Sequence, residues 1–158
     1  MLPDPLHPAV VHLPIAIAVL LPFATGLAAL AIRAGWLERR AWSLVLLLHL
    51  AGAGSAWWAE ETGHDQEERV EKVVPERPIH EHEEAGEWLA LVMGATALVT
   101  AVGLLGGRVG ALARGVAVLG ALAVLAASYQ TGRSGGALVY EHDAARAYQP
   151  PTRSERAP

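Results

Sequence analysis

The chain has 158 residues, 53% of them apolar, and a formal net charge of −4 at pH 7. It contains no cysteine, which excludes disulfides and thiolate metal sites. It carries no basic patch and no nucleic-acid motif, which argues against nucleic acid as a partner. Charged residues are nearly absent from four long stretches and crowd the connections between them, as burial in hydrocarbon requires.

The four apolar stretches predict four transmembrane helices, since a bilayer core needs about 20 apolar residues in a helix. In chain order they cover about residues 9–32, 41–59, 85–105 and 109–128. The first contains Pro14 and Pro22, the second ends beside a Trp pair, and the last two are rich in Gly and Ala. Such small residues allow a neighbouring helix, or a flat ligand, to approach the backbone closely.

Residues 1–149 are therefore expected to form an all-α integral membrane four-helix bundle, followed by a disordered tail at 150–158. A weak internal repeat favours two helical hairpins of similar design. The second helix runs into Thr62-Gly63-His64, and the fourth runs into Thr131-Gly132-Arg133. Duplicated halves of this kind occur in membrane carriers.

The connections between the helices predict the orientation. The short connections 33–40 and 106–114 are basic, whereas residues 60–84, expected to be a loop, hold ten carboxylates. The positive-inside rule places the two short connections in the cytoplasm and both termini outside. We therefore expect a multi-pass membrane protein in contact with lipid.

Most of the seven histidines fall at one end of this bundle. With an up-and-down topology, six of them share the outer end: His7, His12, His64, His80, His82 and His142. The remaining one, His49, lies in mid-membrane without an imidazole at the same depth on another helix. We expect His49 to be a packing residue bonded to a hydroxyl such as that of Thr25 or Thr96.

Imidazoles near a bilayer can ligate a metal or haem iron, or relay protons. A b-type haem needs two imidazoles from different helices, with small residues one turn away. His12 precedes Ala16 by one turn, and His82 precedes Gly86 by one turn. His12 and His82 are therefore the predicted iron ligands of a haem b.

Other interpretations of the same residues stay open. His64, His80 and Glu84, with Asp65, could instead bind a divalent metal such as Zn²⁺ or Cu²⁺, which imidazole suits. The same side chains could be solvated loop residues, and His12 could be a packing residue. No zinc-protease-like spacing is present to decide between them.

The segment after the fourth helix is the most distinctive part of the chain, reading TGRSGGALVYEH from Thr131 to His142. Its glycines, Gly135 and Gly136 among them, are expected to end the helix. The apolar piece that ends in Tyr140 would then fold back over the mouth of the bundle and bring His142 toward the other histidines.

These motifs together resemble a known family. His7-Pro8, the segment VHLPIA from Val11, Thr62-Gly63, a histidine opening the third helix and the TGRSGGALVYEH segment resemble the bacterial predicted membrane-protein family catalogued as domain of unknown function 2231. The resemblance covers about residues 6–142. The matching positions are His7, His12, His82, Gly135, Gly136, Tyr140 and His142. The chain departs from the pattern by placing His80 and His82 in an acidic run.

The resemblance implies a four-helix membrane domain that is sometimes joined to Rieske-type or cytochrome c-type modules, and hence a role in respiratory or photosynthetic electron transfer. We expect a haem b-binding electron-transfer subunit of a larger complex, whose partner subunits supply the next carrier. The alternative is a non-redox accessory or assembly subunit with a divalent metal or no cofactor. A transporter or proton-relay protein ranks last. No nucleophile elbow or phosphate loop is present, which argues against a stand-alone enzyme.

Overall fold

The computed structural model describes residues 4–149, and within that range every regular element is helical. In chain order the elements are α1 (His7–Val10), α2 (His12–Arg33), the 3₁₀ turn η1 (Arg39–Ala41), α3 (Trp42–Val70), α4 (Glu76–Val102), α5 (Gly107–Tyr140) and the 3₁₀ turn η2 (Ala144–Tyr148). Four helical segments are long and apolar enough to cross a membrane, as predicted. The predicted tail at 150–158 lies outside the described residues.

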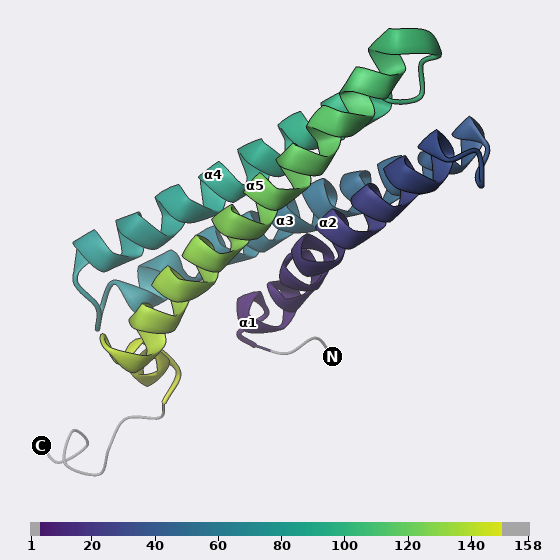
Figure 1. The fold of residues 1–158 in the computed structure, drawn as a ribbon. Coiled ribbons are helices and arrows are strands. Elements are labelled where there is room, and N and C mark those ends of the chain that lie inside the picture. The colour runs from purple at the N-terminus through teal and green to yellow at the C-terminus, as the bar shows by residue number, and fades with distance from the viewer. Residues whose placement is uncertain (1–3, 150–158) are drawn as a thin grey trace, which may run out of the picture.

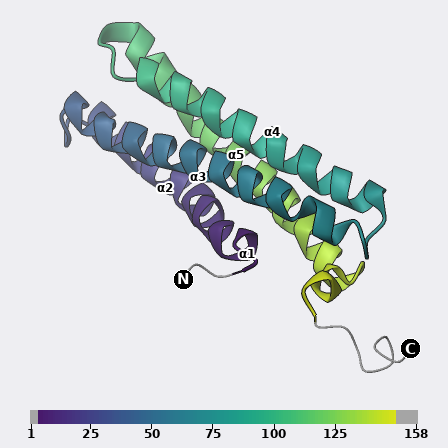
Figure 2. The ribbon, with the colours of Figure 1, turned by 180° about the vertical axis from the view of Figure 1, so that it is seen from behind.

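The four long helices form a bundle in which each packs against two others (Figures 1 and 2). Contacts run from α2 to α3, from α3 to α4, from α4 to α5, and from α5 back to α2. The hairpins α2–α3 and α4–α5 therefore lie side by side, which confirms the predicted bundle. Helices α2 and α4 stand diagonally across it, and the short α1 packs mainly on α3.

Many interior positions hold small side chains beside a few large ones such as Trp42 and Leu21, and large apolar side chains cover the outside. The fully buried positions include Ala18, Ala117 and Ala121, whereas Leu98 is 73% exposed and Leu27 is 68% exposed. In water this distribution would be unfavourable, but lipid tails are as apolar as leucine. Small interior residues let the helices approach closely, so the packing is the one expected of a membrane bundle.

The first predicted helix is interrupted near its start. Helix α1 ends at Val10, Val11 forms a turn, and α2 begins at His12. Pro14 has no backbone N–H, so it cannot bond to the carbonyl of Val10 four residues earlier. The missing bond marks the boundary between α1 and α2, although Val11 keeps a helical conformation with φ of −59°.

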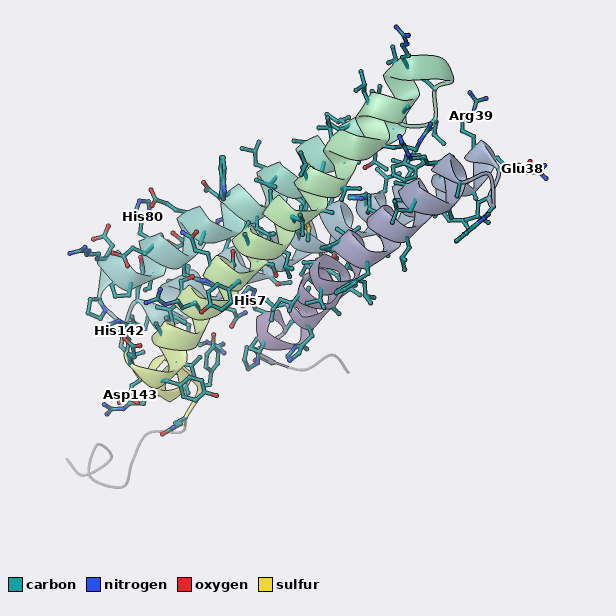
Figure 3. All side chains as sticks on the ribbon, viewed as in Figure 1. His7, Glu38, Arg39, His80, His142 and Asp143 are labelled. Carbon is teal, nitrogen blue, oxygen red and sulfur yellow. The ribbon has the colours of Figure 1, made fainter. Side chains whose placement is uncertain are left out.

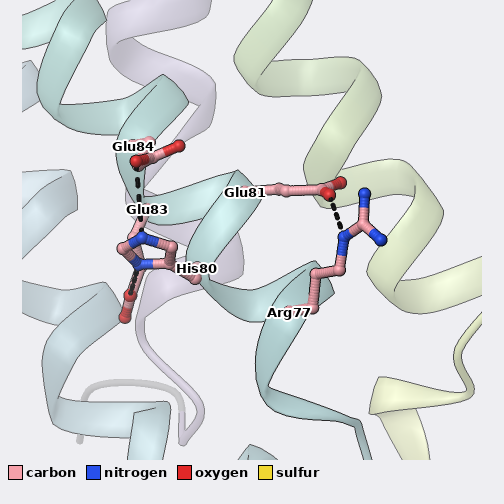
Figure 4. A network of polar contacts seen from close by, with 5 residues as sticks. All are labelled: Arg77, His80, Glu81, Glu83 and Glu84. Atoms are coloured by element: carbon pink, nitrogen blue, oxygen red, sulfur yellow. Dashed lines mark hydrogen bonds and ion pairs between the residues drawn. The ribbon is translucent and has the colours of Figure 1, made fainter.

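The acidic stretch 60–84 was expected to be a loop, but most of it is helical. Helix α3 continues to Val70 and α4 begins at Glu76, so only a short turn remains between them. Glutamate, glutamine, lysine and arginine favour the helix intrinsically, and only the membrane-spanning part of a helix must be apolar. Salt bridges one helical turn apart, such as Arg77–Glu81 at 2.9 Å, support the exposed ends (Figure 4).

The glycines of the TGRSGGALVYEH segment do not end the fourth helix either. Helix α5 continues to Tyr140 without interruption. Each glycine disfavours a helix by about 1 kcal/mol relative to alanine, but tertiary contacts outweigh that cost. Thr131 donates a hydrogen bond to the carbonyl of Ala85 on α4 at 2.8 Å, and Leu138 is buried.

His49 is buried in the middle of the bundle, with 1% of its surface exposed. Its Nε2 lies 3.1 Å from the Thr25 hydroxyl, which confirms the predicted packing role and one of its two expected partners. Its Nδ1 has no hydrogen-bond partner among the described residues. A buried polar atom without a partner lowers stability by about 1–3 kcal/mol.

His49→Leu is therefore expected to leave the thermal unfolding midpoint in detergent unchanged or to raise it, because leucine removes the unpaired Nδ1. Thr25→Val in the wild-type background should lower the midpoint, because both ring nitrogens then lack a partner. The same Thr25→Val change in the His49→Leu background should have a smaller effect. Equal effects of Thr25→Val in the two backgrounds would contradict the assigned pairing.

Candidate functional site

Two histidines from diagonally opposite parts of the bundle meet at one end of it. The ring centres of His7, on α1, and His82, on α4, are 6.2 Å apart, and the ring planes are inclined by 78°. Figure 3 labels His7 at the same end of the molecule as His80 and His142, and Arg39 at the opposite end. The end chosen from the sequence for the histidines is therefore the end at which they gather.

The His7 ring is held against α3 through its Nδ1. This atom lies 2.9 Å from the carbonyl oxygen of Ala59 and 3.3 Å from the hydroxyl oxygen of Thr62. Gly63 leaves room for the ring: a Cβ at that position would lie 3.3 Å from the His7 Cε1. A carbonyl oxygen can only accept, so Nδ1 of His7 donates.

The His82 ring is held against α5 in the same manner. Its Nδ1 lies 2.9 Å from the Ser134 hydroxyl oxygen, and the Thr131 carbonyl is a further partner of the ring. A Cβ at Gly135 would lie 2.9 Å from the His82 Cε1, closer than real Cβ atoms approach another atom. Only glycine therefore allows the ring to occupy this position undisturbed.

The two histidine-holding arrangements have the same spacing along their helices. Ala59, Thr62 and Gly63 on α3 correspond to Thr131, Ser134 and Gly135 on α5. This correspondence has a different register from the predicted repeat, which paired Thr62-Gly63 with Thr131-Gly132. The contacts pair it with Ser134-Gly135.

A cavity of about 550 Å³ opens beside the two rings. Its walls are mostly apolar and come from every long helix. They include Pro8, Val11, Pro14, Leu89, Leu138 and Val139, together with Gly63, Gly86, Gly132 and Gly135. The polar part of the wall includes three carboxylates, Glu60, Glu67 and Glu83, together with His64, Gln66, Thr131 and Tyr148.

The chain after α5 folds back over this cavity. Asp143 adopts the left-handed conformation with φ of 57°, which aspartate tolerates, and η2 then lies against the bundle. The Tyr148 hydroxyl donates to Gln66 at 3.1 Å, and the Arg69 guanidinium lies 5.3 Å from the centre of the Tyr148 ring. Partial burial raises the pKa of the Tyr148 phenol, so it remains a donor. The expected fold-back of residues 138–140 is therefore wrong, since these residues continue α5, and the chain folds back only after Asp143.

The predicted pair His12 and His82 is not brought together. His12 is exposed on the outside of α2 and does not line the cavity. His7 and His12 are five positions apart, which is about 140° around a helix, so only one of them can face inward. His7 takes that position.

The three predicted glycines and the two residues predicted after them are divided between the cavity and the surface. Gly86 and Gly135 line the cavity, whereas Gly136 does not. Tyr140 is 89% exposed, and His142 is half-buried outside the cavity wall. The uninterrupted helix α5 explains this, because it carries Tyr140 past the mouth of the bundle.

The alternative metal ligands lie on two different surfaces. His80 Nε2 is 3.3 Å from Glu84 and its Nδ1 is 3.9 Å from Glu83, on the exposed side of α4 (Figure 4). His64 belongs to the cavity wall on α3. Within residues 4–149 no group of three or more histidine or carboxylate side chains could hold a metal ion.

Three functional features of the site did not emerge from the sequence. The anchoring hydroxyls of Thr62 and Ser134 were not assigned a role, nor was Gly63 or the contact of Tyr148 with Gln66. One signal was available: a Ser or Thr directly before a Gly near the end of each second hairpin helix.

No curated protein and no solved structure matches the chain. A family described as predicted membrane protein (DUF2231) matches residues 3–147, which include the bundle, both anchored histidines and the cavity. The chain therefore belongs to this family of predicted membrane proteins.

Proposed function

We propose that the protein is a haem b-binding electron-transfer subunit, with His7 and His82 as the iron ligands. One observation carries the proposal: two imidazoles from different helices approach each other with Nδ1 anchored and Nε2 unbonded among the described residues. Metal-binding histidines characteristically donate the other ring N–H to a carbonyl or another acceptor, which fixes the tautomer and the ring orientation.

The distance between the rings fits a metal between them. With a metal–nitrogen distance of about 2.0 Å, two imidazoles on opposite sides of one ion have ring centres about 6 Å apart. The rings of His7 and His82 are 6.2 Å apart. A separation of 6.2 Å leaves room for a shared ion, although edge-to-face ring pairs also pack at such distances.

The cavity supports the same cofactor. Its volume of about 550 Å³ lies within the usual range of small-molecule and cofactor sites, about 300–1,000 Å³. Gly86 and Gly132 expose backbone on its wall, which suits a flat ring system. When bound, haem b supplies one-electron exchange at its iron, and the protein supplies the ligands, the apolar enclosure and the lid formed by η2.

The charged residues support a membrane orientation. Five arginines lie in or near the two turns that join α2 to α3 and α4 to α5, namely Arg33, Arg39, Arg40, Arg108 and Arg114. Figure 3 shows Arg39 at the end opposite to His7. Under the positive-inside rule that end faces the cytoplasm of a bacterial inner membrane, and the cavity opens near the outer face. An electron carrier there would serve a partner redox subunit on the outer side.

A second candidate is a non-redox accessory subunit that binds a divalent cation such as Zn²⁺ or Cu²⁺. The acidic wall formed by Glu60, Glu67 and Glu83 favours it, because carboxylates attract cations and repel the propionates of haem. His7 and His82 would then be two of the ligands.

The test is a reduced-minus-oxidised visible spectrum of the protein purified in mild detergent, with a pyridine haemochrome assay. The proposal expects a sharp α-band and one haem b per chain. A preparation that remains colourless after expression with added haem would overturn it. Elemental analysis of the same preparation would then detect zinc or copper if the second candidate is correct.

A further inference from the structure

Each anchoring hydroxyl has a backbone carbonyl of its own helix as a hydrogen-bond acceptor. Thr62 Oγ1 donates to the carbonyl of Ala59 at 2.9 Å, and Ser134 Oγ donates to the carbonyl of Thr131 at 3.0 Å. A hydroxyl has one proton to donate and two lone pairs with which to accept. When each proton points at its carbonyl, the hydroxyl oxygen faces the imidazole with a lone pair and accepts.

The same contacts favour one tautomer of each histidine. His82 Nδ1 lies 2.9 Å from Ser134 Oγ, and because the Ser134 proton has the Thr131 carbonyl as its acceptor, this arrangement favours a proton on Nδ1. His7 Nδ1 faces the Ala59 carbonyl and the Thr62 oxygen, and the same conclusion holds. In both rings Nε2 is left with its lone pair, which is the form that can bind a metal.

We propose that Ser134 and Thr62 are positioning residues that fix His82 and His7 as Nδ1–H tautomers and so prepare both Nε2 atoms to bind iron. The part that concerns iron rests on the proposed function; the assignment of the tautomers does not. Neither hydroxyl lines the cavity, so each acts through its imidazole.

The two positioning residues differ in importance. His7 keeps the Ala59 carbonyl at 2.9 Å even without the Thr62 hydroxyl, which is the more distant partner at 3.3 Å. For His82 the Ser134 hydroxyl, at 2.9 Å, is the partner that meets hydrogen-bond geometry. Ser134→Ala should therefore have a larger effect than Thr62→Ala.

The first measurement is ¹⁵N NMR of histidine-labelled, haem-free protein in detergent, with His7 and His82 assigned by substitution. The wild type should show protonated Nδ1 and bare Nε2 at both positions. Ser134→Ala should convert His82 to a mixture of tautomers, and Ser134→Thr should restore the wild-type signal. Protonated Nε2 at both histidines in the wild type, or no change in Ser134→Ala, would overturn the inference.

The second measurement uses the haem-loaded protein. Loss of such an outer partner typically lowers metal affinity about 10–100-fold, and Ser134→Ala should fall in that range, with a shifted midpoint potential. Thr62→Ala should lose less haem affinity, and Ser134→Thr should recover both affinity and potential.

If the wild type binds no haem, the proposed function fails while the NMR result still decides the tautomers. If haem binds and Ser134→Ala matches the wild type in affinity and potential, the positioning role is wrong.

Discussion

Replacement of His7 or His82 by alanine is expected to lower the affinity for haem b by more than about 100-fold, since loss of an outer partner alone lowers metal affinity about 10–100-fold. Both rings are anchored beside the cavity, and each would supply one of two iron ligands. Haem content per chain, measured by the pyridine haemochrome assay, gives the result for each variant.

His12→Ala is the matched control for this experiment. It removes the same side chain from the same end of the bundle, but His12 is exposed and does not line the cavity. We expect His12→Ala to keep its haem. Retention of haem by His7→Ala together with its loss in His12→Ala would reverse the assignment and restore the ligand pair predicted from the sequence. Gel filtration and helical content confirm in each case that the variant folds.

Gly135→Ala is expected to displace the His82 ring and to lower haem affinity, on the order of 10–100-fold. The added Cβ would lie 2.9 Å from His82 Cε1, so the ring has to move and its bond to Ser134 is disturbed. The substitution should not destabilise α5, because alanine is more favourable in a helix than glycine by about 1 kcal/mol. Haem titration and the thermal midpoint of the haem-free protein separate the two effects.

Gly136→Ala provides the control on the same helix. It brings the same gain in helix propensity, and a Cβ at Gly136 meets nothing within 4 Å. We expect haem affinity close to that of the wild type and an unchanged or slightly raised thermal midpoint. Gly63→Ala should be intermediate, because its Cβ would meet the His7 ring at the longer distance of 3.3 Å. Equal behaviour of Gly135→Ala and Gly136→Ala would show that the close contact with His82 does not matter.

The sequence by itself determined the number of membrane-spanning helices and their order. Charged side chains are unfavourable in hydrocarbon, so four apolar stretches bounded by charged connections predict four transmembrane helices. The four long helices lie at those stretches. Alternation of direction then places His7, His64 and His82 at one end. It also isolates His49 in mid-membrane, where it bonds to Thr25, one of the two partners expected for it.

Helix ends were harder to predict than helix centres. The acidic stretch 60–84 and the glycines near Gly135 both looked like breaks, yet α3, α4 and α5 continue through them. Charged residues are excluded from hydrocarbon but not from helices. The cost of a glycine is about 1 kcal/mol and depends on what packs around it. Local sequence does not contain that information.

Only the tertiary structure decided which histidine faces inward and what holds it. His7 and His12 are equally close to the start of the first helix, and the turn at Val11 together with packing against α3 selects His7. The hydroxyls of Thr62 and Ser134 lie more than fifty residues from their histidines, at separations of 55 and 52. Contacts of that kind arise when separate helices pack side by side, so the helical periodicity of a single segment cannot predict them.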